Sequence, residues 1–487
     1  MEVVPAIAAA LALFLPFFAW ILRWAHERRF IRELVAGPGL LPPGSMGWPL
    51  LGEMFDFLRY FKFAKRPDDF ITKRKARYGD TGIYRSHLFG SPVIITCSPE
   101  FNKQVLSRMT EEESLSSGWP SNKLLGNSSI AVVDGILHKR LRKSLMEAFT
   151  NPKALNAQLS IAQPVIISAL EKWVSKRWIV AYDETKTMTF CNMCEVLVSF
   201  KSMELLGKME GLYRGLMAGL RSLTINIPGT AYHHALKCRK QLTDILLDEM
   251  RKRVEQAVQK QDFMQILMDS VDENGAKLRE MEVVENIVSL ILGGYESTSD
   301  VMMWGLYYLA KHPDILERLK EEAKLIRKQK HKGELLSIED IKSMNYTSKV
   351  AEELIRLANI SPFIFRRVVK DDVVLNGYWL PKNWKVIVWI RSIHIDSKYY
   401  SDPLAFNPDR WTDLKPKLGT YSVFGAGPRY CPGSSFARSL LKIFLYHACL
   451  NYRWELLNPD VGFAYQPHPR PRDGAKMIFS RAQGDNY

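Results

Sequence analysis

The order of apolar and polar residues along the chain predicts long helices and a small β part. Residues 242–258 and 282–311 carry apolar side chains at the spacing of helices that pack against a core. Residues 81–88 and 93–96 flank Phe-Gly-Ser-Pro as the two strands of a hairpin would. In residues 373–380, Asn-Gly separates two short apolar runs, and this dipeptide is preferred in type I′ hairpin turns. The fold class indicated is mainly α with a minor β part.

The first apolar stretch has the length of a membrane span. Residues 3–22 carry no charge, and about 20 helical residues cover the roughly 30 Å of a bilayer core. A cleavable signal peptide begins with basic residues and ends in small ones, whereas Glu2 precedes this run and bulky Trp20 lies near its end. Arginines follow within residues 23–32, which by the positive-inside rule places the remainder in the cytosol. We expect an uncleaved anchor over residues 1–24, with a buried core helix as the alternative.

A neck follows the anchor. Residues 25–52 are basic and rich in proline and glycine, and proline restricts both its own backbone and that of the preceding residue. This composition predicts a semi-rigid connector. The length of the remaining chain, residues 53–487, admits one large domain or two or three ordinary ones.

Composition and charge exclude several classes of protein. Hydrophobic residues make up 47% of the 487 residues and charged ones 24%, which excludes a disordered chain. The 67 Lys and Arg residues outnumber the 52 Asp and Glu residues, giving a net charge of +15. No module of interleaved basic and aromatic residues accompanies that charge, so we expect no nucleic-acid partner. The excess positive charge is instead suited to an anionic membrane surface or an acidic protein partner.

One segment of the second long helical pattern is unusual. Residues 287–294 are apolar almost all round, as in a helix buried inside a protein. Gly293 and Gly294 end this run in mid-helix, where each glycine costs about 1 kcal/mol relative to alanine. Either a flat or bulky group approaches the helix there, or another helix packs closely against it. This segment alone leaves both interpretations open.

A cysteine near the C-terminus has the surroundings of a metal ligand. Cys431 lies in a loop punctuated by glycines, directly before an apolar helical pattern. Arg429, the loop N–H groups and the N-terminus of the following helix would stabilise a thiolate. The glycine spacing does not match a dinucleotide-binding loop. The alternative is an inert buried cysteine, which is common for this residue type.

A second feature is an acid and a base on one helix face. Glu353 and Arg356 are three residues apart and are flanked by apolar residues, so they are suited to a buried pair. Arg410 follows later in the chain and would complete a Glu-Arg-Arg network. Such a network is rigid when every member is paired, and it would hold the segment that leads to Cys431.

Together these motifs resemble the haem-thiolate cytochrome P450 monooxygenases over essentially the whole chain. The cysteine loop of that family, Phe-x-x-Gly-x-Arg-x-Cys-x-Gly, is matched by Phe424, Gly427, Arg429, Cys431 and Gly433. The Glu-x-x-Arg motif of the family falls on the acid and base described above. The resemblance implies the cytochrome P450 fold, a single large haem domain over residues 53–487 that carries the catalytic site, haem b as cofactor and Cys431 as the axial ligand of its iron.

The oxygen-activating helix of that family reads Ala/Gly-Gly-x-Asp/Glu-Thr-Thr/Ser. It is matched by Gly293, Gly294, Glu296, Ser297 and Thr298, with serine where threonine is usual. The resemblance implies that a hydroxyl here helps to deliver protons, and either Ser297 or Thr298 would carry that role. Glu296 is a candidate proton relay, or alternatively an ordinary surface charge of the helix.

The resemblance also implies partners for the two haem propionates. The family often has Trp-x-x-x-Arg where this chain has His138 and Arg142. These two residues are joined by Arg366 and Arg429 as expected propionate partners, since the guanidinium fork suits a carboxylate. Phe424 and Gly433 of the cysteine loop complete the set of residues expected to contact the cofactor.

Within the family, the neck and several inner segments look like the plant ent-kaurenoic acid oxidases and β-amyrin 11-oxidases, which act on terpenoids. This implies an apolar substrate, a diterpenoid such as ent-kaurenoic acid or a triterpenoid or steroid. The expected pocket lining is Leu292, Gly293, Pro362, Phe363 and Ile364. The resemblance further implies O2 as oxidant, electrons from NADPH through NADPH-cytochrome P450 reductase, and a single-pass endoplasmic reticulum protein with a cytosolic catalytic domain. The alternatives are a haem-dependent isomerase or dehydratase that needs no O2, and a catalytically dead, membrane-tethered lipid-binding protein.

Overall fold

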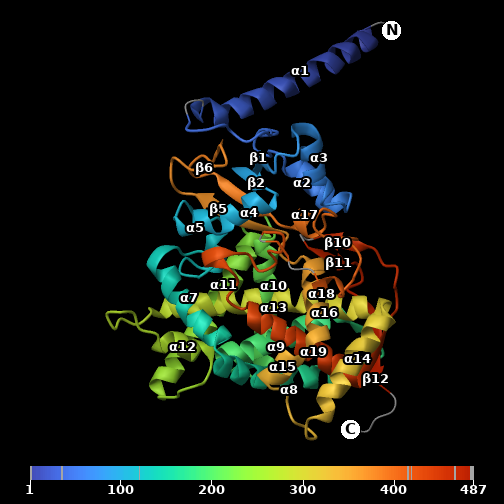
Figure 1. Cartoon of the computed structure of the whole chain (residues 1–487). Helices are drawn as coiled ribbons and strands as arrows, with labels where there is room; N and C mark the ends of the chain where they lie inside the picture. Colours follow the sequence, from blue (N-terminus) through green and yellow to red (C-terminus); the bar gives the residue numbers. More distant parts are fainter. Residues whose placement is uncertain are drawn as a thin grey trace.

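Helices make up most of the computed structural model, and its larger β-sheet lies near the N-terminal helix (Figure 1). The structure describes residues 3–34, 37–119, 121–413, 416–417, 419–465 and 468–482, and gives the backbone alone for residues 3–13, 15, 16, 33 and 111. The predicted class, mainly α with a minor β part, is confirmed.

The helices, in chain order, are α1 Val3–Ile31, α2 Met54–Leu58, α3 Asp69–Tyr78, α4 Pro99–Leu106, α5 Arg108–Glu111, α6 Asn122–Leu125, α7 Gly135–Thr150, α8 Pro152–Val174, α9 Ala181–Val198, α10 Met203–Leu220, α11 Ala231–Glu255, α12 Phe263–Asp269, α13 Glu280–Lys311, α14 Pro313–Lys328, α15 Ile338–Ser343, α16 Asn345–Ala358, α17 Arg391–His394, α18 Arg410–Asp413 and α19 Ser434–Asn451. Three short segments of other helical types are η1 Arg32–Leu34, η2 Arg59–Phe63 and η3 Gly427–Arg429. The strands are β1 Ile83–Leu88, β2 Ser91–Thr96, β3 Leu115–Ser117, β4 Ile179–Val180, β5 Phe363–Val368, β6 Val374–Leu375, β7 Tyr378–Trp379, β8 Lys385–Trp389, β9 Tyr452–Leu456, β10 Phe463–Tyr465, β11 Pro469–Pro471 and β12 Lys476–Arg481.

The largest sheet is covered on both faces. Its strand order is β1-β2-β8-β5-β3, antiparallel except for the parallel pair β2-β8. Because successive side chains of a strand point to opposite faces, Val386 and Val388 join one buried cluster while Ile387 and Trp389 join another. Helix α4 contributes to the first cluster, and α2, η2 and α3 contribute to the second. This sheet therefore has a small hydrophobic core on each of its faces and lies beside the helical body.

Both predicted hairpins are present. Strands β1 and β2 pair from Ile83 opposite Thr96 to Leu88 opposite Ser91, so the turn is shorter than the sequence indicated. The turn residues Phe89 and Gly90 both have positive φ, as do Asn376 and Gly377 between β6 and β7. Two consecutive positive φ values define the type I′ turn, which matches the right-handed twist of its strands.

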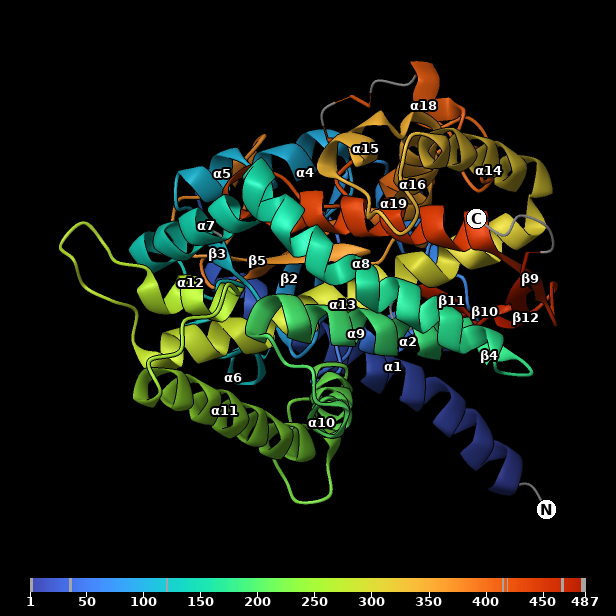
Figure 2. The same cartoon turned by 90° about the horizontal axis from the view of Figure 1, so that it is seen from below.

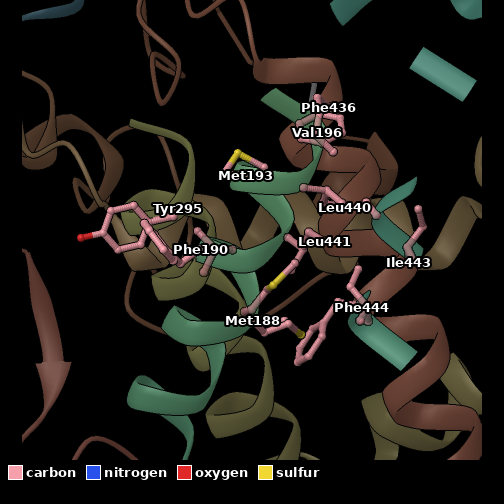
Figure 3. Packing of buried hydrophobic residues seen from close by; sticks show 14 of the residues in the cluster. Met188, Phe190, Met193, Val196, Tyr295, Phe436, Leu440, Leu441, Ile443 and Phe444 are labelled. Carbon is pink, nitrogen blue, oxygen red and sulfur yellow. The ribbon is translucent and has the colours of Figure 1, made fainter. Parts of the chain in front are cut away.

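The helical core is built around α13. Helix α9 lies against α13 and α8, and α19 also packs on α13 and on α8; Figure 3 shows Phe190 facing Tyr295 and the leucines of α19 among the same buried residues. The ring centroids of Phe190 and Tyr295 are 5.4 Å apart in an edge-to-face arrangement. Helices α10 and α11 pack on each other along one edge of this body (Figure 2). Four residues of the apolar run at 287–294 are thus buried, as its composition predicted, namely Ile287, Val288, Ile291 and Leu292.

Helix α1 meets the body at its C-terminal end. The Glu27 carboxylate accepts hydrogen bonds from Arg85 of β1 at 2.8 Å and from the Met46 N–H of the neck at 2.8 Å. The ring of His26 lies edge-on to that of His87, with 5.1 Å between centroids. Among the side chains that the structure describes, no helix combines the length and hydropathy required to cross a bilayer. Most of the predicted anchor's side chains lie outside the described set.

Candidate functional site

The loop around Cys431 is closed by short backbone contacts directly before α19. The Cys431 N–H donates to the Phe424 carbonyl at 2.9 Å. Burial raises the pKa of the Cys431 thiol, while a hydrogen bond from the Gly433 N–H and the charges of Arg438 and Arg142 act to lower it. Burial alone keeps the thiol protonated. A bound metal cation would offset that cost, so the thiol would lose its proton and become a thiolate.

Four basic side chains from three segments gather beside this loop. Burial lowers the pKa of Arg366 to about 10 and that of His138 to about 4, and the charge of Arg429 adds to both effects. The Nε atom of Arg366 is buried with no hydrogen-bond partner among the described residues. Arg142 donates to the Tyr430 carbonyl at 2.7 Å, and Arg429 pairs with Asp134. Among these residues, the Asp134 carboxylate is thus outnumbered by the three arginines. The remaining positive charge is suited to an anionic ligand.

The two glycines of α13 serve different purposes. A Cβ atom on Gly294 would lie 2.4 Å from the Met193 sulfur, so this glycine permits the close approach of α9 to α13. A Cβ atom on Gly293 would meet no atom within 4 Å, and Gly293 is exposed although its helix is buried. Ser297, one turn further along, is partly exposed and donates to the Gly293 carbonyl at 2.7 Å. Close helix packing therefore accounts for Gly294, and the approach of a flat or bulky group at Gly293 stays a prediction for which the space is open.

The other candidate residues of α13 point elsewhere. Leu292 and Thr298 are buried. The buried Glu296 carboxylate accepts hydrogen bonds from Lys186 at 2.6 Å and Arg221 at 2.9 Å, and a third from the adjacent tyrosine at 3.2 Å. Glu296 is therefore a paired internal charge. Its role as a proton relay stays a prediction.

Strand β5 divides the rest of the predicted pocket lining between its two faces. Ile364 lies near the cysteine loop, 3.7 Å from where a Cβ on Gly425 would be. Phe363 points the other way into an aromatic cluster, with its ring centroid 5.3 Å from that of Trp389. Pro362 is buried and its carbonyl accepts two backbone hydrogen bonds. Of these three residues, Ile364 shares a face of the strand with Arg366.

The predicted Glu-Arg-Arg network is complete and buried. Glu353 accepts two hydrogen bonds from Arg356, at 2.7 and 2.9 Å, and one from Arg410 at 2.9 Å. The Trp411 indole N–H and the Asn407 backbone N–H also donate to it, at 2.9 and 3.1 Å. Five donor contacts satisfy the carboxylate, which is the condition under which a buried charge is tolerated.

His394 links this network to the cysteine loop. Its carbonyl accepts from Arg356 at 2.6 Å, and its Nε2 atom accepts from the Ser422 N–H at 3.2 Å. Burial, together with the charges of Arg356 and Arg391, lowers the pKa of His394 to about 3. The imidazole is therefore neutral, as an acceptor at Nε2 must be.

Comparison with known proteins accounts for this arrangement. The cytochrome P450 family pattern matches residues 42–464, which is most of the chain. The chain is a cytochrome P450. A solved structure, the retinoic acid bound cyanobacterial CYP120A1, superposes with a TM-score of 0.79 at 28% identity, covering 91% of this chain and 100% of its own.

Plant enzymes are among the similar proteins of this cytochrome P450. A 7,8-epoxymelianol synthase of Ailanthus altissima is 39% identical over 94% of this chain and 93% of its own length. Ent-kaurenoic acid oxidase 2 of Arabidopsis thaliana is 35% identical over 95% of each chain. Beta-amyrin 11-oxidase of Glycyrrhiza uralensis is 36% identical over 90% of each chain. The predicted resemblance to this plant branch is confirmed.

The residues present fit the haem that this cytochrome P450 family carries. The unpaired Nε of Arg366 and the excess of cations suit two propionates. The open space at Gly293 and the absence of any atom within 4 Å of a Cβ on Gly433 leave room for a flat group. Cys431 at the N-terminus of α19 offers the thiolate.

Three residues of this cytochrome P450 site were not found from the sequence. Asp134 pairs with Arg429, His394 holds the cysteine loop, and Trp411 donates to Glu353. Trp411 was adjacent to a predicted member of the network, so its position was a usable clue. Asp134 and His394 act through contacts between distant segments, which no local spacing indicates.

Proposed function

We propose that this cytochrome P450 hydroxylates, or further oxidises, an apolar terpenoid, either a diterpenoid such as ent-kaurenoic acid or a triterpenoid or steroid. The observation that carries the proposal is the open space beside α13 at Gly293, one helical turn from the Ser297 hydroxyl. Three relatives are named for products or substrates that include ent-kaurenoic acid and beta-amyrin, which supports this substrate class.

When bound, haem with a thiolate ligand would supply the activation of O2, and two electrons and two protons would be needed for one oxygen atom to enter a C–H bond and the other to leave as water. The chain's own residues orient the cofactor and the substrate and deliver protons. Ser297 presents a hydroxyl on the open face, where it can pass a proton inward. His138, Arg142, Arg366 and Arg429 orient the cofactor by its propionates. Gly293 and Ile364 border the substrate, and Leu292, Pro362 and Phe363 support that border from behind.

The proposal includes NADPH-cytochrome P450 reductase as the electron donor. The net charge of +15 suits an acidic protein partner and an anionic membrane surface. In the purified protein, NADPH should reduce the haem only when the reductase is added. The same rate without the reductase would contradict this part of the proposal.

We also propose that residues 1–24 anchor the protein in the endoplasmic reticulum membrane, with residues 53–487 as the cytosolic catalytic domain. Phe14, Phe17, Trp20 and Trp24 of α1 are exposed, and the helix projects from the body (Figure 1). Apolar and aromatic side chains exposed in this way are suited to lipid. The full chain should resist alkaline carbonate extraction from microsomes, and a chain lacking residues 1–24 should be released.

The experiment that tests the function is coexpression with a plant reductase in microsomes supplied with a panel of diterpenoids and triterpenoids. Oxygenated product that requires NADPH and O2 is expected. Product formed without O2 would favour the isomerase or dehydratase alternative. The absence of a thiolate-type carbon monoxide difference spectrum would favour the alternative of a catalytically dead lipid-binding protein.

A Cys431→His variant ties that activity to the proposed ligand. It should keep haem but lose the thiolate-type spectrum and the product, since imidazole donates less electron density than thiolate. Cys191→Ser is the matched control, because Cys191 is also a free, half-buried cysteine but lies in α9. Turnover of Cys431→His at the wild-type level would exclude Cys431 as the ligand.

A further inference from the structure

Two adjacent glutamates of α16, Glu352 and Glu353, bind different residues that lie close in sequence to the cysteine loop. Glu353 belongs to the buried network already described. Glu352 faces the other way and accepts hydrogen bonds from Arg438 Nε at 2.5 Å and from the Tyr421 hydroxyl at 2.5 Å. Burial and the Glu352 charge raise the pKa of Tyr421 well above its ordinary value, so its phenol remains a donor. Of these three residues, only Arg438 belongs to the site as described so far, through its charge beside the Cys431 thiol.

Arg438 is held in contact with both flanks of the cysteine loop. Its guanidinium carbon lies 4.3 Å from the centroid of the Phe424 ring, within cation–π range. Its Nη1 atom is 3.4 Å from the Tyr430 hydroxyl. Phe424 accepts the hydrogen bond from the Cys431 N–H, and Tyr430 directly precedes that cysteine. The position of Arg438 is therefore fixed relative to the sulfur.

The charge of Arg438 is partly shielded from water. The side chains of Arg438 and Glu352 are 27% and 23% exposed, so solvent and salt screen this cation less than a surface lysine. Arg142, the other cation that acts on Cys431, belongs to the propionate cluster. Of these two cations, Arg438 is thus the one that lies outside the propionate cluster.

We propose that Arg438 is a positioning residue that sets the reduction potential of the iron bound at Cys431, with Glu352 holding its guanidinium against the Phe424 ring. This inference rests on the proposed ligation by Cys431. When Fe(III) takes up one electron, the iron–thiolate unit becomes more negative by one charge. A fixed cation nearby stabilises the reduced state more than the oxidised state, because the interaction energy is proportional to the charge.

The test is the midpoint potential of the full-length holoprotein, titrated with dithionite as the one-electron donor. Arg438→Met removes the cation and should lower the potential. Glu352→Gln removes the anion, keeps the cation and should raise it. The double variant removes both charges and should return the potential toward wild type, while Arg438→Lys keeps the charge and should stay near wild type.

Opposite shifts of the two single variants support an electrostatic role. Shifts in the same direction, or unchanged potentials, overturn it, because a purely structural clamp would act through loop disorder in both variants. The potential is read only from protein with the thiolate-type carbon monoxide band, so a misfolded fraction does not contribute. If Arg438→Met yields no such protein, the direction of the shift in Glu352→Gln still decides the sign, with Arg438→Lys as the control that keeps the charge.

Arg318→Met provides the control. Arg318 also ties a helix to the segment before the cysteine loop, through Asp409 at 2.7 Å, but is more exposed and contacts no residue of the loop. Its potential should equal that of wild type. A wild-type protein without the thiolate-type band would refute the proposed function itself, whereas an intact band with equal potentials would refute the role of Arg438 alone.

Discussion

Ser297 and Thr298 are neighbours in the sequence but meet different surroundings in α13. Successive residues of a helix point about 100° apart, so only Ser297 shares the open face with Gly293, four residues before it. Thr298 is buried within the helical core. The sequence could not decide which hydroxyl delivers protons, because both match the motif. The difference arises from how α13 is rotated against α9.

Replacement of these two hydroxyls should therefore have unequal effects. Ser297→Ala should lower the product formed per NADPH several-fold, because electrons then leave as peroxide when protons are not delivered. Ser297→Thr should keep wild-type coupling, and Thr298→Val should change coupling little. Product and peroxide are measured against NADPH consumed. Equal loss of coupling in Ser297→Ala and Thr298→Val would contradict the assignment.

At the scale of elements, the contact of α9 with α13 depends on a single glycine. Gly294→Ala would place a methyl group 2.4 Å from the Met193 sulfur, so the helices must separate. Overpacking of this kind typically costs about 1–3 kcal/mol. Gly293→Ala should instead fold as well as wild type, since alanine favours helix and its methyl enters open space. Thermal unfolding should separate the two variants.

Two further variants check that interpretation. Met193→Ala should partly rescue Gly294→Ala, because it removes the sulfur that the new methyl would meet. Gly293→Ala should weaken substrate binding without loss of stability, as read from substrate-induced spectral change. A Gly294→Ala single variant as stable as wild type would contradict the separate roles of the two glycines. Unchanged substrate binding in Gly293→Ala would contradict them as well.

The Glu353 network should be the most sensitive element contact. Glu353→Gln leaves two buried arginines without their counter-charge, a loss of about 3–5 kcal/mol for a broken buried pair. The exposed Arg318–Asp409 pair joins nearby segments, and Arg318→Met should cost at most about 1 kcal/mol. Haem retention during urea titration measures both. Similar midpoints for the two variants would mean that the network contributes no more than a surface pair.

Which elements could be predicted depends on how local their determinants are. Both hairpins followed from their turn residues, Phe-Gly-Ser-Pro for the first and Asn-Gly for the second, because the type I′ turn needs only a local change of φ. The parallel pairing of β2 with β8 joins residues 93–96 to residues 385–388, and nothing near either strand indicates the other. The Glu-Arg-Arg network was predictable because its members lie in recognisable motifs. The Glu352–Arg438 contact was not, since each residue alone looks like a surface charge.

At the scale of the whole molecule, histidines whose pKa is lowered on folding make stability depend on pH, among them His394 and His447. Desolvation lowers the pKa of His394 to about 3 and that of His447 to about 4. Between these values and the ordinary pKa near 6.5, the unfolded chain binds protons that the folded chain does not. The free energy of unfolding should therefore fall as pH drops below about 6.5, by up to about 1.4 kcal/mol per pH unit for each histidine.

His394→Gln should reduce this slope by the share of one proton, since glutamine can still accept from the Ser422 N–H but does not titrate. Denaturant unfolding at several pH values between 5 and 7, followed by loss of the thiolate-type spectrum, gives the slope as an order-of-magnitude check. The exposed His331→Gln variant is the control. An unchanged slope in His394→Gln would mean that this imidazole takes up its proton in the folded protein too.

The cation cluster beside Cys431 also determines when the protein can acquire its cofactor during synthesis. The contact between Arg142 and the Tyr430 carbonyl joins residues 288 positions apart in the chain. A ribosome adding about 5–20 residues per second needs roughly 15–60 s to make that span. The early half of the molecule must therefore wait, already partly folded, for the segment that carries the ligand. Haem insertion is consequently a late event that follows translation of nearly the whole chain.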